Sequence, residues 1–179
     1  MRLITWAIAL ALLTACSTVR VSVDYDPEED FTTYSSYAWL PQTPEATGHP
    51  RADSPMVQRR LRSGVDRALA NKGFREVSSD PDFWVTFHMS VAQKLDVSTS
   101  YTPYRRYGYT MSIPETEVRE YEEGTVIIDI VDARERELVW RGIGRGRLRR
   151  AAPEPEKQEE IANEVAAEIL SAFPPGSAG

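Results

Sequence analysis

Histidine and cysteine are the side chains of this sequence best suited to proton transfer or nucleophilic attack, and the chain has two histidines and one cysteine. His88 lies in a segment in which apolar and polar residues alternate. A hydrolase or transferase acting on cell-wall material would need this histidine beside a carboxylate such as Asp129 or Asp132. No serine, cysteine or pair of acids stands beside His88 in the sequence, which favours a structural or surface histidine. We therefore expect no catalytic residue, no metal site and no cofactor.

The cysteine ends an N-terminal region that has the layout of a secretory signal. Arg2 supplies a positive charge, an almost uninterrupted apolar run covers residues 3–13, and the sequence Leu-Thr-Ala-Cys follows. The run is shorter than the roughly 20 residues that a helix needs to span a bilayer. The four residues are similar to the lipobox of bacterial lipoproteins, which predicts cleavage between Ala15 and Cys16 and lipidation of Cys16. The alternative is an unmodified cysteine after an ordinary signal peptidase site.

Lipidation of Cys16 would anchor the mature chain to a membrane without a spanning segment. Each buried CH₂ contributes about 0.8 kcal/mol, so two or more acyl chains such as palmitate make the attachment stable. Ser17 stands where a retention signal for the inner membrane would usually be aspartate. Resemblance to known lipoproteins therefore implies attachment to the outer membrane, facing the periplasm.

A second candidate site is the tyrosine- and arginine-rich segment of residues 92–112, which we expect to be a loop because it contains Pro103 and Gly108. Aromatic side chains interleaved with arginine are favoured at recognition surfaces. Such a loop would bind peptidoglycan or a protein of the envelope; alternatively, it covers one end or edge of the sheet. The candidate recognition residues are Tyr101, Tyr104, Arg105, Arg106, Tyr107 and Tyr109.

The glycines between Gly142 and Gly146 have the composition of a phosphate-binding loop but not its context. Such a loop needs a helix directly after the glycines, so that backbone N–H groups and the helix dipole face the phosphate. No helix is expected here before Pro153, so the glycines are expected to bend the strand or to let a neighbouring aromatic ring lie over it. Four arginines on alternate positions are expected to pair with acidic residues of 115–123: Arg141, Arg145, Arg147 and Arg149.

Hydrophobic periodicity outlines the elements that must position these residues. For the first helix, Ser54 is the expected N-cap, Pro55 the first residue and Gly73 the residue after its end. A second helix is expected over residues 153–173. Period-two alternation and turn signals predict strands over residues 19–25, 34–40, 73–77 and 83–91.

The clearest strand pattern spans residues 124–146, where two β-rich runs flank a charged turn. If Asp132 pairs with Glu137, the apolar side chains divide between the two faces of a hairpin. Because the first strand would be apolar on both faces, we expect it at the centre of the sheet. One face would carry Val126, Ile128, Ile130, Val139 and Ile143, and the other Ile127, Val131, Leu138 and Trp140.

Length and composition limit the architecture to one domain of moderate size. The 179 residues are 41% hydrophobic and 27% charged, and the formal net charge of −6 argues against nucleic acid as a partner. The predicted fold is a single α+β domain, an antiparallel or mixed β-sheet with two helices packed on one face. The predicted boundaries are residues 1–15 for the cleaved signal peptide, 16–18 for the lipidated N-terminus and tether, 19–175 for the domain and 176–179 for a mobile tail.

A set of short motifs, in a fixed order, covers nearly all of the mature chain: Val21-Ser22-Val23-Asp24-Tyr25-Asp26, Tyr37-Ala38-Trp39-Leu40-Pro41, Lys72-Gly73-Phe74, Pro81-Asp82-Phe83-Trp84-Val85, Gly124-Thr125-Val126-Ile127-Ile128-Asp129, Val139-Trp140-Arg141-Gly142 and Phe173-Pro174-Pro175. This set resembles the bacterial lipoproteins classed under domain of unknown function 4136. The resemblance implies an envelope lipoprotein with an α+β domain, and it supplies no activity and no catalytic residues. The segment from Tyr101 to Tyr109 matches no motif of that family.

The lipobox and the lack of a catalytic constellation lead to one principal hypothesis. The chain is expected to be a non-enzymatic, lipid-anchored periplasmic module that binds or scaffolds another component of the envelope. The alternative is a hydrolase or transferase directed at the cell wall, using His88 and a carboxylate.

Overall fold

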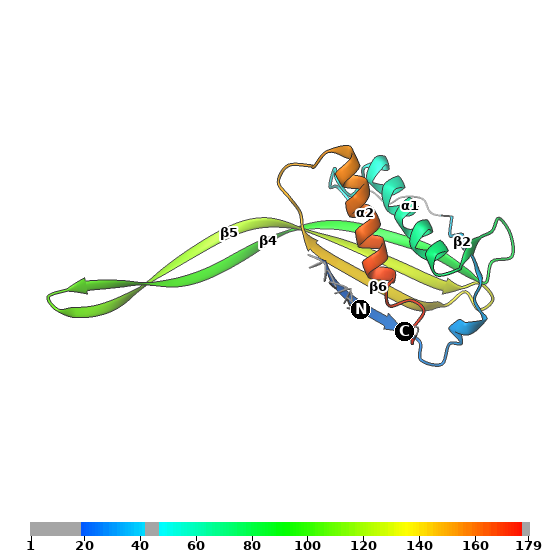
Figure 1. Cartoon of the computed structure of the whole chain (residues 1–179), viewed down its shortest axis with the longest axis horizontal. Helices are drawn as coiled ribbons and strands as arrows, with labels where there is room; N and C mark the ends of the chain where they lie inside the picture. Colours follow the sequence, from blue (N-terminus) through cyan, green and yellow to red (C-terminus); the bar gives the residue numbers. More distant parts are fainter. Residues whose placement is uncertain (1–18, 42–46, 177–179) are drawn as a thin grey trace, which may run out of the picture.

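The computed structural model describes residues 19–41 and 47–176, in which six strands form one sheet (Figure 1). The predicted signal peptide and Cys16 lie outside the described residues. The sheet order is β1-β6-β5-β4-β2-β3; β2 runs parallel to β3 and β4, and the other neighbours are antiparallel. The elements are β1 (Arg20–Tyr25), η1 (Phe31–Thr33), β2 (Ser36–Trp39), α1 (Pro55–Asn71), β3 (Arg75–Glu76), β4 (Phe83–Arg106), β5 (Tyr109–Asp132), β6 (Leu138–Arg147) and α2 (Pro155–Leu170).

Both helices cover the same face of this mixed sheet, which confirms the predicted α+β class (Figure 1). They approach each other closely at Gly64 of α1, where an added Cβ would come within 2.9 Å of the carbonyl oxygen of Ala162 in α2. A glycine at this position therefore lets the two backbones meet. The apolar residues buried in this way are Leu61, Val65, Ala68 and Leu69 of α1 and Ala166, Ile169 and Leu170 of α2.

The helix ends follow from backbone chemistry. As predicted, α1 begins at Pro55 after Ser54, and Gly73 beyond its end has a φ of +92°, which favours glycine. The second helix begins at Pro155, two residues later than expected. A residue before proline is disfavoured in the helical conformation, and Glu154 accordingly has the extended ψ of 153°.

The core lies between the helices and strands β4, β5 and β6. Ile128, Ile130 and Trp140 from the sheet and Phe173 beyond α2 are completely buried, as are the helix residues Val65, Leu69, Ile169 and Leu170. Burying a side chain of this size contributes roughly 1.5–3 kcal/mol. The sequence of residues 124–146 was correctly predicted to hold a central strand, because β5 has β6 on one side and β4 on the other.

The predicted faces of the 124–146 hairpin are partly wrong, and a β-bulge is the reason. The Asp132 N–H donates to the Glu137 carbonyl as expected, but Val139 is an extra residue between the pairs Val131–Leu138 and Ile130–Trp140. One extra residue moves every later side chain to the other face. Trp140 therefore lies on the helix-covered face with Ile130, and Ile143 lies on the opposite face with Ile127.

The glycines of β6 serve this packing. At Gly142 an added Cβ would collide with the Trp140 ring and with Ile169 of α2, so the aromatic ring lies over the glycine as predicted. At Gly144 it would collide with Ile169 as well. The strand and the helix can approach this closely only because these positions have no side chain.

The expectation of a loop over residues 92–112 is wrong. These residues continue β4 and β5 into one long hairpin that extends away from the helix-covered body (Figure 1). Strand β6 ends at Arg147, opposite Glu123, so beyond this pair β4 and β5 have only each other; we call residues 92–123 the arm. In a ribbon of two strands each strand has an open edge, where proline is tolerated, and Pro103 is accommodated in this way.

Candidate functional site

The candidate recognition residues lie in the outer half of the arm. Tyr107 and Gly108 form its two-residue turn, with φ values of 51° and 82°. Positive φ at both central positions is typical of the tight turn whose twist matches a β-hairpin. The side chain of Arg106 lies outside the described part of the structure. The two strands and the turn carry all six predicted residues: Tyr101, Tyr104, Arg105, Arg106, Tyr107 and Tyr109.

The pairing of β4 with β5 divides the apolar side chains of the arm between its two faces. The face that continues the helix-covered side of the body carries the stem patch, defined as Leu95, Val97, Tyr101 and Val118. The opposite face carries the tip patch, defined as Tyr104, Tyr109, Met111 and Ile113. All eight side chains are between 48% and 77% exposed, so nothing in the described chain covers them.

The base of the arm is held to the body by Arg147 at the end of β6. Its guanidinium donates to the Asp96 carboxylate over 3.0 Å and lies 3.8 Å from the centre of the Tyr121 ring. Further out, the hydroxyls of Thr99 and Thr116 are 3.3 Å apart across the two strands. An isolated two-stranded ribbon is at best marginally stable in water. The arm therefore depends on such cross-strand contacts or on a partner.

The predicted partners of the arginine stripe are wrong for the two arginines whose contacts are known. Arg141 forms a bidentate pair with Asp129, with both N–O distances 2.7 Å, because these residues lie opposite each other in the sheet. Arg147 reaches across β5 to Asp96 of β4. Neither acid belongs to residues 115–123. The arginines thus secure the sheet rather than form an open basic stripe at these two positions.

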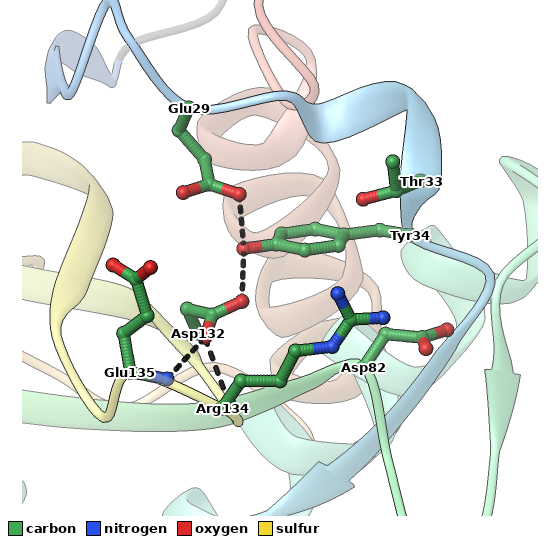
Figure 2. Close-up of a pocket in the computed structure, with 7 residues that line it drawn as sticks. All are labelled: Glu29, Thr33, Tyr34, Asp82, Asp132, Arg134 and Glu135. Atoms are coloured by element: carbon green, nitrogen blue, oxygen red, sulfur yellow. Dashed lines mark hydrogen bonds between the residues drawn. The ribbon is translucent and has the colours of Figure 1, made fainter.

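A small polar pocket lies at the opposite end of the body from the arm. Its cavity of about 100 Å³ is centred on Tyr34, whose hydroxyl is 2.9 Å from a Glu29 carboxylate oxygen and 3.0 Å from one of Asp132 (Figure 2). The hydroxyl has one hydrogen and donates it to one carboxylate at a time. The lining residues are Glu29, Thr33, Tyr34, Asp82, Asp132, Arg134 and Glu135.

The acids of this pocket are already bound by donors of the protein. Burial alone would raise the pKa of Asp132, but N–H groups of Glu135 and Arg134 and the Tyr34 hydroxyl hold it below its usual range. Burial, followed by the two neighbouring carboxylates, raises the pKa of Tyr34 above its usual range, so the phenol stays protonated. The pocket therefore ties the segment before β2 to the β5–β6 turn.

Asp82, on the wall of the same pocket, has a similar role. Its carboxylate accepts hydrogen bonds of 2.8 to 3.0 Å from the backbone and hydroxyl groups of Ser35 and Ser36. Burial opposes the charge, yet these donors lower the pKa of Asp82. Among residues 19–41 and 47–176, no three His, Cys, Asp or Glu side chains are grouped so that they could hold a metal ion.

The residues of the alternative catalytic hypothesis are not assembled around His88. His88 is exposed and pairs with Ile127 across the β4–β5 ladder. Asp129 is bound by Arg141, and Asp132 belongs to the Tyr34 pocket. Residues 129 and 132 also lie on opposite faces of β5 because side chains alternate along a strand. Neither of the two carboxylates named in this hypothesis is therefore free to act with His88.

The predicted anchor cannot be placed, because Ala15 and Cys16 lie outside the described residues. The first described strand, β1, begins at Arg20, so the described fold starts close to the predicted lipidation site. Neither helix of the described residues is long and apolar enough to cross a bilayer.

Sequence reasoning found the tyrosines of the arm but missed its aliphatic side chains. Leu95, Val97 and Val118 form most of the stem patch. The available signal was the position of Leu95 and Val97, which continue the alternate spacing of apolar residues past Val91. Pro103 and Gly108, which are typical of loops, favoured the wrong prediction of a loop.

Known structures with a similar fold differ widely from this chain in sequence. A crystal structure of a PDZ domain protein from Parabacteroides distasonis ATCC 8503 has a TM-score of 0.57 at 13% identity, with 90% of this chain covered. This chain spans only 37% of that protein. A PelC dodecamer from Paraburkholderia phytofirmans has a TM-score of 0.48 at 13% identity, over 86% of this chain and 96% of that one. At such identities the likeness concerns the fold alone.

Sequence comparison supplies the family. No curated protein is detectably similar to the chain. The model of one family, described as a domain of unknown function (DUF4136), matches residues 21–175, which is nearly all of the described domain. The motifs quoted above, from Val21 in β1 to Pro175 after α2, lie within this match. The chain therefore belongs to the DUF4136 family.

Proposed function

We propose that the chain is a lipid-anchored module of the bacterial envelope that binds a partner protein with its arm and performs no catalysis. Lipid on Cys16 holds it to the outer membrane, facing the periplasm. The arm presents the stem patch and the tip patch to the partner. The lipobox motif supports the anchor, and the geometry of β4 and β5 supports the binding role.

The observation that carries this proposal is the exposure of apolar side chains on both faces of the arm. Leu95, Val97 and Val118 are 57–63% exposed side by side, whereas four apolar residues of the same two strands within the body are completely buried: Phe83, Val85, Ile128 and Ile130. Clustered exposed apolar side chains mark interaction sites because water leaves them when a partner binds. A protein partner can bury this apolar area of the arm while the body stays folded.

The length of the arm suits a partner that lies away from the anchor. At about 3.3 Å per residue, the part of β4 from residue 92 to 106 reaches roughly 50 Å. The lipidated end precedes β1, which pairs with β6 in the body. The tip can therefore contact a partner that lies at a distance from the proposed anchor.

The anchor is tested by metabolic labelling with radioactive palmitate. Wild type should incorporate label and Cys16→Ala should not, because the acceptor thiol is absent. Equal labelling of the two proteins, or no labelling of either, would refute lipidation at this residue.

The arm is tested by photo-crosslinking in intact envelopes. A photoreactive residue at Val97, in the stem patch, should give a discrete protein adduct. The matched control is a photoreactive residue at Ser98, which neighbours it on the other face. The variant Leu95→Ser with Val118→Ser should lose the Val97 adduct. If both positions give the same adducts, or none, the stem patch is not the binding surface.

Peptidoglycan is the other partner expected for the tyrosines, and a sacculus pull-down separates it from a protein. Tyr104→Ala with Tyr107→Ala should leave retention on isolated sacculi unchanged if the partner is a protein. Weakened retention, together with no protein adduct at Val97, would reassign the arm to glycan binding.

The hydrolase or transferase alternative is tested through His88. Because His88 is exposed and Asp129 is bound by Arg141, His88→Ala should complement a deletion strain fully. Loss of complementation by a stable His88→Ala protein would restore the catalytic hypothesis.

A further inference from the structure

A large groove opens where the arm leaves the body, between the two helices and the sheet. Its volume of about 810 Å³ is within the usual range of small-molecule sites, about 300–1,000 Å³. The walls come from α1, α2 and the segment after β6, and the floor from β4, β5 and β6. The apolar side chains that line it include Val57, Met89, Val126, Leu148, Ile161 and Val165.

The groove exists because the apolar interior continues beyond the side chains that fill the core. Val85 and Ile128 are completely buried, whereas Met89 and Val126, further along the same strands, are only half-buried. Gly124 and Gly144 contribute no side chains to the floor. Half-covered aliphatic groups in a concave site stabilise the protein further only if another apolar group takes the place of water.

The lining of the groove is basic although the chain as a whole is acidic. It contains five cationic residues, Arg51, Arg60, Arg147, Arg149 and Lys157, against two acids, Glu164 and Glu168. The formal net charge of the chain is −6. A surplus of cations around an apolar site attracts a molecule with an apolar part and an anionic part.

Arg60 is the cation best placed to meet the anionic part. Arg51, Arg147 and Lys157 are paired with Glu122, Asp96 and Glu160, and Arg149 is exposed to solvent. Half-buried Arg60 instead donates over 2.7 Å to Gln158, which is neutral, and within the described chain it forms no ion pair. Its guanidinium has further N–H groups for a carboxylate or phosphate.

The walls and the floor favour an acyl chain over a peptide. Apart from the segments before α1 and after β6, they are the side-chain faces of helices and of a sheet, whose backbone groups are already hydrogen-bonded to one another. A peptide in the groove would bring N–H and C=O groups that these faces cannot satisfy, at a cost in free energy. A hydrocarbon chain brings none.

We propose that this groove binds one acyl chain of an anionic lipid taken from the adjacent membrane, with the lipid head group at Arg60. Val19, which lines the groove, is close in sequence to the predicted anchor at Cys16. The inference relies on the proposed anchor only to bring the groove to a membrane. Binding of a lipid in solution depends on neither the anchor nor the arm. An experiment can therefore refute lipid binding in the groove without refuting the proposed function, and the reverse.

The test titrates the full chain with cis-parinaric acid, a fatty acid that becomes fluorescent in apolar surroundings. All proteins carry Cys16→Ser, so that no lipid is attached. We expect saturable binding of one molecule per chain and at least about tenfold weaker binding to Val57→Glu, because a buried carboxylate excludes the acyl chain. Met56→Glu is the matched control. Met56 is next to Val57 in the sequence, but its side chain is 57% exposed and does not line the groove.

The head-group contact is tested by a second pair of variants that leave the apolar lining intact. Arg60→Gln should weaken parinarate binding about tenfold, while exposed Arg59→Gln should not change it. The methyl ester of the probe should bind Arg60→Gln and the parent protein equally. If Val57→Glu proves unfolded by circular dichroism, this second pair decides alone. Absence of saturable binding, or equal effects within either pair, would overturn the proposal.

A comparison with the lipidated protein identifies the source of the acyl chain. Protein with an intact Cys16, purified from envelopes and freed of detergent, should bind the probe as well as Cys16→Ser once bound lipid has been extracted. If it binds the probe only after Cys16 is replaced, the chain's own anchor occupies the groove. That result would overturn the assignment to a membrane lipid.

Discussion

Strands β4 and β5 form one ladder of residue pairs, from Phe83 and Asp132 to Arg106 and Tyr109, but its two halves have opposite surroundings. In the body, Phe83, Val85 and Ile130 are completely buried under the helices; in the arm, Leu95 and Val97 are more than 60% exposed. The backbone hydrogen bonds are of the same kind in both halves. Since water competes for such bonds, their net contribution is small, and burial makes the body stable. The arm is an exposed surface that is supported by the stable body.

The largest expected effect is a loss of stability in the body. Phe83→Ala should lower the free energy of unfolding by about 3–5 kcal/mol, because it leaves a cavity among the rings of Tyr37, Phe74 and Phe173. Urea denaturation followed by circular dichroism measures it. Leu95→Ala in the arm is the control and should stay within about 0.5 kcal/mol of wild type. Comparable losses in the two variants would mean that the arm is part of the core.

A second prediction concerns the close approach of β6 to α2. Gly142→Ala should cost about 1–3 kcal/mol, because the new methyl group collides with the Trp140 ring and Ile169. The measurement is again urea denaturation, supported by near-ultraviolet circular dichroism of the tryptophan. A neutral or stabilising result would contradict the position of Trp140 after the bulge.

A third prediction concerns Asp132, whose folded-state pKa is lowered by its donors. A lowered pKa adds stability above the unfolded value of about 3.9, and this stability is lost as the pH falls through the lower folded value. Asp132→Asn should therefore be about 1–3 kcal/mol less stable than wild type at neutral pH, with the difference shrinking below about pH 4. Glu117→Gln, at an exposed pair of the arm, should leave the profile unchanged. A difference that grows with acid would contradict the role given to Asp132.

The smallest expected effect on global stability comes from a change at the turn of the arm. Gly108→Ala places a side chain at a φ of 82°, which costs about 1–2 kcal/mol at the turn. The tip should fray, while the free energy of global unfolding changes by less than about 0.5 kcal/mol. Hydrogen exchange should accelerate at the tip amides and remain slow at Ile128 and Ile130. Faster exchange in the body as well would show that tip and body unfold together.

The parts of the fold that were predicted correctly have local causes. Ser54 and Pro55 start α1, Gly73 follows its end, and Asp132 pairs with Glu137, since capping and turn chemistry involve residues near in sequence. The wrong predictions needed longer-range information. A single extra residue, Val139, reversed the face of Trp140, and no pattern in the sequence marks it.

The candidate site shows the same division. Its tyrosines and arginines were recognised from composition, because aromatic and cationic side chains cluster there. That they stand on an extended ribbon depends on where β6 ends, at Arg147 opposite Glu123. The groove beside the arm could not be predicted, since its lining comes from five elements far apart in the chain.

The sequence by itself determined the family, the α+β class and the ends of α1, because each depends on neighbouring residues or on motifs in order. Only the tertiary structure decided which segments of β4 and β5 are covered, which face of β6 meets the helices, and where the apolar interior remains open. Burial is a property of elements that meet in space, and the same alternating pattern serves a buried strand and an exposed arm.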